Sequence, residues 1–112
     1  MDWAQIQQTQ DIHAMQVEVP EWGMTCFIKT LSRAEHDQWE VVLTSTPDDK
    51  RGDIRIALVG LCLCDENGNR IVPDDKFAEL GTKHFKAIER LYEAAVKHNS
   101  LGNDAVEDAK KN

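Results

Sequence analysis

The chain has 112 residues, a length that favours a single domain with one hydrophobic core. Its hydrophobic fraction of 41% is sufficient for such a core and argues against a disordered protein. The 20 acidic and 13 basic residues give a net charge of −7, which repels nucleic-acid phosphates and anionic lipid alike. We therefore expect neither a nucleic acid nor a membrane as a partner.

The sequence predicts a cytoplasmic location and reduced cysteines. Residues 1–10 lack the basic cluster and apolar run of a secretory signal. The most apolar stretch, residues 54–64, is much shorter than the ~20 residues of a membrane-spanning helix. Three cysteines form an odd set, with Cys62 and Cys64 only two positions apart, so we expect free thiols in the core rather than disulfides.

The first 14 residues predict an arm outside the folded domain. Trp3, Ile6 and Ile12 are isolated among polar residues. Their spacing suits one side of a helix, but the positions between Ile6 and Ile12 that would complete this side are not apolar. We expect a flexible or weakly helical arm over residues 1–14 and a single domain over residues 15–112.

A β-hairpin is predicted at the start of the domain. Val17 and Val19 alternate with polar residues, and Pro20 ends the run because proline cannot donate to a strand ladder. Gly23 suits a turn, and residues 24–31 contain good strand formers. A hairpin alone is marginally stable, so helices are expected to cover it.

Two helices are predicted next. Ser32 and Glu35 have the spacing of a capping box, and the helix that they start should end before Pro47. Residues 53–62 fit both strand alternation and helical periodicity. Their length and a possible N-cap at Asp53 favour a buried helix.

The second half predicts a ribbon and further helices. Asn67-Gly68 is a strong hairpin signal within a possible two-stranded ribbon over residues 63–72. A short helix should follow and end at Gly81, and Thr82 is the expected cap of the longest helix, which ends near Asn99.

A last turn capped by Asp104 is also predicted. The fold class expected from these elements is α+β, with an N-terminal β-hairpin packed on a predominantly helical domain of four to five helices.

The sequence predicts no metal or cofactor site. Cys62 and Cys64 have no downstream second pair of the kind that structural zinc requires. The segment from Asp65 resembles a calcium loop only at its start, since Arg70 replaces the required glycine and Lys76 the final glutamate.

No catalytic residue is predicted, and we expect a protein that is not an enzyme. The usual nucleophile and phosphate-binding motifs are absent from the sequence. The acidic run Glu35, Asp37 and Glu40 is typical of a solvated helix face. An enzymatic alternative would need His36 or Cys64 to converge with carboxylates in a deep pocket.

Aromatic residues are the candidate partner contacts. Trp39 is expected in the core, whereas Trp22, at the hairpin tip, fits core packing and partner binding equally well. With Phe85 and Tyr92 of the longest helix, Trp22 makes up the predicted partner-binding set.

Several segments, in this order, resemble the tail assembly chaperones of long-tailed (siphovirus-type) bacteriophages. They are Val17-Glu18-Val19-Pro20-Glu21-Trp22-Gly23, Leu31-Ser32, residues 65–70, Ala78-Glu79-Leu80-Gly81 and residues 99–112. The resemblance covers residues 17–112 and adds little for the arm.

The resemblance implies a protein that binds the tape measure protein, keeps it soluble and promotes assembly of the tail tube protein. Such a chaperone acts in the host bacterial cytoplasm, is absent from the mature virion and can form homo-oligomers. The family often makes a longer frameshifted product, with which Ala109-Lys110-Lys111 is compatible. The alternative is a minor structural or head–tail connector protein of a phage or prophage.

Overall fold

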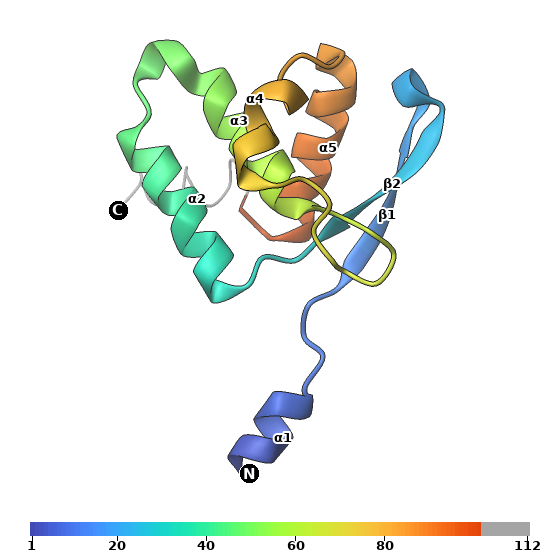
Figure 1. Cartoon of the computed structure of the whole chain (residues 1–112), viewed down its shortest axis with the longest axis vertical. Coiled ribbons are helices and arrows are strands. Elements are labelled where there is room, and N and C mark those ends of the chain that lie inside the picture. Colours follow the sequence, from blue (N-terminus) through green and yellow to red (C-terminus); the bar gives the residue numbers. More distant parts are fainter. Residues whose placement is uncertain (102–112) are drawn as a thin grey trace.

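The computed structural model describes residues 1–101, which form an α+β fold (Figure 1). The helices are α1 (Trp3–Gln8), α2 (Arg33–Ser45), α3 (Arg51–Cys62), α4 (Phe77–Leu80) and α5 (Phe85–His98). The strands are β1 (Ala14–Val19), β2 (Met24–Lys29) and β3 (Leu63–Cys64). These elements confirm the predicted fold class, and the turn predicted at Asp104 lies outside the described residues.

The sheet is antiparallel with the strand order β1-β2-β3. β1 and β2 form the predicted hairpin, joined by a single 3-10 turn over Pro20–Trp22. Gly23 closes this turn with φ +63°, a left-handed conformation that glycine adopts without strain.

The predicted ribbon over residues 63–72 is present in a reduced form. Cys64 and Arg70 form an antiparallel bridge, with backbone hydrogen bonds from Asp65 N–H to the Asn69 carbonyl at 2.8 Å and from Ile71 N–H to the Leu63 carbonyl at 3.2 Å. The prediction missed that Leu63 and Cys64 also pair with β2 as a third strand. Both residues are almost fully buried, so pairing with β2 keeps these apolar side chains in the core. The Asn67-Gly68 turn itself is present, with φ +85° at Gly68.

Helix α3 lies at the centre of the helical part and packs against α2, α4 and α5. It begins at Arg51, directly after a 3-10 turn, so the prediction of Asp53 as its N-cap is wrong. Asp53 instead lies in the first turn, where a negative charge interacts favourably with the helix dipole.

The hydrophobic core forms between the sheet and these helices. The prediction that Trp39 belongs to the core is confirmed, since it is 7% exposed. The largest fully buried side chains are Ile28, Leu58, Leu61, Leu91, Val19, Val59 and Cys62. Within residues 1–101, no helix is both long and apolar enough to cross a membrane.

The start of α5 differs from the prediction. His84, not Thr82, is the N-cap, and its Nδ1 accepts a hydrogen bond from the Lys86 N–H at 3.1 Å. The Thr82 hydroxyl is already used at the end of α4, where it donates to the Glu79 carbonyl at 2.6 Å.

Asn99 connects the end of α5 to the segment between β2 and α2. Its side-chain oxygen accepts the Leu31 N–H at 2.7 Å, and its amide nitrogen donates to the Lys29 carbonyl at 3.3 Å. A single side chain at the end of α5 therefore satisfies two backbone groups of the segment that follows β2, which fixes α5 against the sheet.

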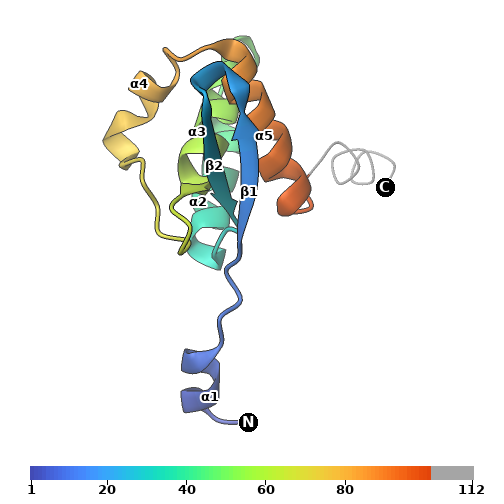
Figure 2. The same cartoon turned by 90° about the vertical axis from the view of Figure 1, so that its right-hand side faces the viewer.

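The N-terminal arm, residues 1–13, projects from the rest of the molecule (Figures 1 and 2). Every residue of the arm is exposed. Asp2 caps α1 through a capping box with Gln5, in which each side chain accepts the backbone N–H of the other residue.

Candidate interaction groove

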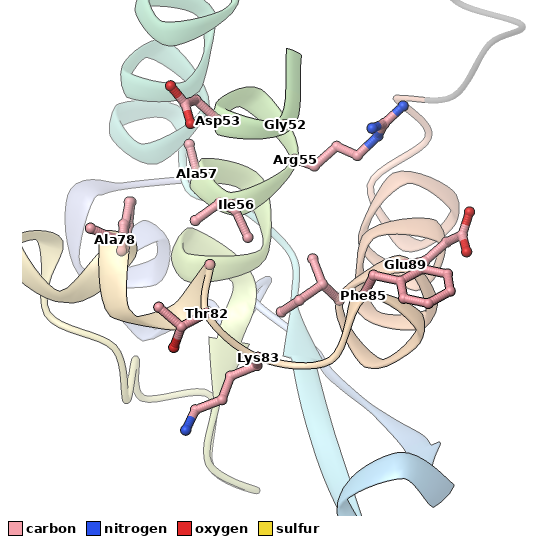
Figure 3. A pocket seen from close by; sticks show the side chains of 13 residues that line it. Gly52, Asp53, Arg55, Ile56, Ala57, Ala78, Thr82, Lys83, Phe85 and Glu89 are labelled. Atoms are coloured by element: carbon pink, nitrogen blue, oxygen red, sulfur yellow. The ribbon is translucent and has the colours of Figure 1, made fainter. Parts of the chain in front are cut away.

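A groove of about 770 Å³ lies between α3, α4 and the start of α5; we call it the α3–α5 groove (Figure 3). Its apolar lining comes from Ile56, Ala57, Phe77, Ala78, Phe85 and Ile88. Its charged lining comes from Asp53, Arg55, Lys83 and Glu89. An apolar concave surface with a few charged groups is the usual form of a binding site.

Small residues keep the groove open on both walls. Gly52 and Ala57 lie on the α3 side, and Ala78 and Gly81 lie on the α4 side. No atom lies within 4 Å of the Cβ position at Gly52, so the space beside it is empty. A larger side chain at Gly52 would have space to enter, whereas a Cβ at Gly81 would already lie 3.6 Å from Ile56.

Phe85 is the most exposed aromatic residue of the predicted partner-binding set. It is 69% exposed and stacks on the His84 ring, with ring centroids 5.2 Å apart. Tyr92 follows two turns later on the same flank of α5 and is half-buried. The Arg55 guanidinium lies 5.8 Å from the centre of the Tyr92 ring, within the range of a cation–π contact.

Trp22 lies on the other flank of α5. Its neighbour Glu21 is ion-paired with Arg90 at 2.8 Å, and Arg90 is about 140° around the helix from Phe85. The hydrogen bond from Arg90 holds the pKa of Glu21 below its ordinary value. The structure thus brings Phe85 and Tyr92 to one flank, and places Trp22, half-buried against the core, on the other.

Sequence reasoning missed the residues of the groove floor. Ile56 is half-buried, packs against the core and lies about 40° around α3 from the buried Gly60. Its position in the helical pattern therefore does not distinguish it from a core residue. Ile88 gives no signal either, because it belongs to the apolar stripe of α5 and is 7% exposed.

The acidic face of α2 forms an ion-pair cluster away from the groove. Potential ligand atoms of His36, Asp37 and Glu40 lie within 4.8 Å of one another. The Arg33 guanidinium lies among them, 2.8 Å from Asp37 and 3.4 Å from Glu40. The cluster therefore carries its own cation as a counter-charge.

Cys62 and Cys64 lie in the core beside the sheet. Burial raises the pKa of Cys62 to about 12 and is also the main cause of the raised pKa of Cys64. Neither Cys64 nor His36 lines the α3–α5 groove, so this groove does not unite the residues that the enzymatic alternative requires.

Comparison with known proteins gives a relation at the level of the fold. No protein-family model matches the sequence, and no curated protein matches it either. The structure of the bacteriophage HK97 tail assembly chaperone is similar to this chain with a TM-score of 0.63 and 19% sequence identity. The match covers 89% of this chain and 92% of that chain, so the two share a fold over nearly their whole lengths.

Proposed function

We propose that this chain is a tail assembly chaperone of a long-tailed phage, which binds the tape measure protein, keeps it soluble and promotes assembly of the tail tube. The main support is the fold shared with the HK97 tail assembly chaperone over 89% of this chain. The ordered sequence segments between residues 17 and 112 point to the same family independently of the fold.

The α3–α5 groove is the proposed contact for a helical segment of the tape measure protein. An amphipathic helix binds a groove by inserting apolar side chains at helical spacing. Phe85 supplies an exposed aromatic edge, and Ile56 and Ile88 supply an apolar floor. The charged lining residues can orient the helix through its polar face.

The acidic surface suits a carrier of an apolar, aggregation-prone partner. With a net charge of −7, copies bound along one long helix would repel other loaded complexes and keep them in solution. Weak contacts repeated along the same partner would add to a high avidity. The proposed role is non-enzymatic, takes place in the host cytoplasm and allows homo-oligomers.

Co-expression with the cognate tape measure protein tests the proposal. The tape measure protein should become soluble and co-purify with the chain. Phe85→Ala should reduce the recovered complex about tenfold or more, because an exposed aromatic anchor is lost without disturbing the core. Lys86→Ala, at the next position and also exposed, is the matched control and should leave recovery unchanged.

Equal precipitation of the tape measure protein with and without the chain would overturn the proposal. Mass spectrometry of purified phage particles provides a second test, since a chaperone should be absent from them. Stoichiometric presence in particles would instead identify a minor structural or connector protein.

A further inference from the structure

Four charged side chains line the α3–α5 groove. Asp53 and Arg55 belong to α3, Glu89 belongs to α5, and Lys83 lies in the connection that precedes α5. All four residues are exposed, and none of them forms an ion pair within residues 1–101. Their charges are therefore available to a molecule that enters the groove.

The charged cluster on α2 differs in this respect. Asp37 and Glu40 lie 2.8 and 3.4 Å from the Arg33 guanidinium, so their charges are compensated within the helix. A surface with paired charges gains little from a charged partner, because it must first give up its own contacts. The described lining of the α3–α5 groove has no such ion pair, so its charges can contribute to the choice of partner.

One end of the groove carries two acidic side chains and one basic side chain. Arg55 reaches from α3 to α5, where its guanidinium lies 5.8 Å from the centre of the Tyr92 ring. Glu89 precedes Tyr92 by about one turn of α5, which places it at the same end as Arg55. Asp53 also belongs to this end, about 3 Å from Arg55 along the axis of α3. This end of the groove is therefore net acidic.

The other end of the groove carries a single charged lining residue, Lys83. Lys83 precedes Phe85 by two residues, whereas Glu89 follows Phe85 by about 6 Å along α5. In Figure 3 the side chains of Asp53 and Lys83 lie on opposite sides of Ile56. The groove is therefore acidic at one end and basic at the other, with the apolar floor between them.

We propose that the α3–α5 groove selects helical segments of the tape measure protein that carry a basic and an acidic residue at opposite ends of an apolar stripe, an inference that rests on the proposed function. The basic residue faces Asp53 and Glu89, and the acidic residue faces Lys83. Opposite charges favour the complex, and like charges placed against each other disfavour it. An apolar helix with the same charge at both ends therefore binds more weakly.

Reversal of single charges in the full chain is the first measurement. Lys83→Glu makes both ends of the groove acidic, and Glu89→Lys makes both ends basic. Each change should reduce recovery of the co-expressed tape measure protein about fivefold. The matched controls are Lys97→Glu and Glu93→Lys, at exposed positions of α5 outside the groove, and both should leave recovery unchanged.

The four variants separate the charge pattern of the groove from the total charge of the chain. If total charge decides, Lys83→Glu will behave as Lys97→Glu does, and Glu89→Lys as Glu93→Lys does. That result would overturn the inference and leave the proposed function in place. Failure of the wild type itself to recover the tape measure protein would overturn both.

A photo-crosslinker at position 78, on the α4 side of the groove, identifies the bound segment. The crosslinked segment should carry a basic and an acidic residue about two turns apart, with apolar residues at helical spacing between them. Reversing the charge of this acidic residue should weaken binding to the wild type and restore binding to Lys83→Glu. A segment without the two charges, no restoration, or crosslinks only to a second copy of the chain would overturn the inference.

Discussion

At the scale of single residues, the packing of α4 on α3 depends on the absence of one side chain. A Cβ atom at Gly60 would lie 2.3 Å from the Phe77 ring, closer than any real contact. Phe77 packs against the core from the short helix α4, which also forms one wall of the α3–α5 groove. The lack of a side chain at Gly60 thus lets Phe77, and with it α4, lie close to α3.

We expect Gly60→Ala to lower the free energy of unfolding by about 2 kcal/mol, since an overpacked site must displace the Phe77 ring. This is opposite to the usual gain of up to about 1 kcal/mol when alanine replaces glycine in a helix. Gly52→Ala, in the same helix but with empty space around its Cβ position, is the control and should be neutral or stabilising. Urea unfolding measures both, and equal effects would contradict the explanation.

Local capping could be predicted from sequence only where no other element competes for the cap. Ser32 and Glu35 form the predicted reciprocal pair, with hydrogen bonds of 3.2 and 3.0 Å. Thr82 has the same capping chemistry, but its hydroxyl is taken by the last turn of α4. That competition depends on where α4 ends, which the sequence around Thr82 does not specify.

At the scale of elements, a buried ion pair joins β2 to α2. The side chains of Lys29 and Glu35 are 7% and 15% exposed and contact each other directly. Arg70, from the turn after β3, lies 3.9 Å from the second Glu35 oxygen. Burial alone would raise the pKa of Glu35, but hydrogen bonds from Lys29 and Ser32 outweigh it and hold this pKa below the ordinary value of 4.5.

Glu35 should therefore make the free energy of unfolding depend on pH. A carboxylate with a lowered pKa in the folded state stabilises the fold above its unfolded pKa, and this contribution is lost as pH falls through the folded pKa. We expect the wild type to exceed Glu35→Gln in free energy of unfolding at neutral pH, with a difference that shrinks as pH falls below 4.5. Urea unfolding at a series of pH values checks this, and parallel curves for the two proteins would be inconsistent with it.

Element prediction was successful where periodicity was sustained and failed where pairing was long-range. The hairpin and the helices α2 and α5 follow from alternation, capping and helical spacing, whereas α3 follows from the length of its apolar run. The third strand is only Leu63–Cys64, and its partner, Phe27–Ile28, lies far earlier in the chain. Two apolar residues carry no periodicity of their own, so this pairing could not be predicted from local pattern.

At the scale of the whole molecule, the arm and the body are separate units in their packing. No residue of the arm is buried, and its root is held by hydrogen bonds at His13. The predicted boundary after residue 14 differs by a single residue from the start of β1 at Ala14. That boundary rests on the polar composition of the first 14 residues.

Removing residues 1–12 should leave the body folded. We expect the melting temperature to change by less than about 4 °C, equivalent to less than about 1 kcal/mol, because no core contact is lost. Calorimetry measures this change, and a large fall in melting temperature would show that the arm stabilises its own body.

The predicted partner-binding set divides between two surfaces. Phe85, a large aromatic residue on the amphipathic helix α5, lies at the edge of the groove. Trp22, at the end of the hairpin, faces another side of α5. Whether aromatic residues share a surface depends on how helices pack, and a single sequence contains no direct signal of that arrangement.

The reactivity of the two buried thiols, Cys62 and Cys64, can report on the junction between α3 and β3. Cys62 and Cys64 are 0% and 2% exposed, and alkylating reagents react with an accessible thiolate rather than a buried thiol. Each labelling event at these sulfur atoms would record a transient opening of the sheet edge. The rate of their modification would therefore measure how often this part of the native fold opens, without the introduction of a new cysteine.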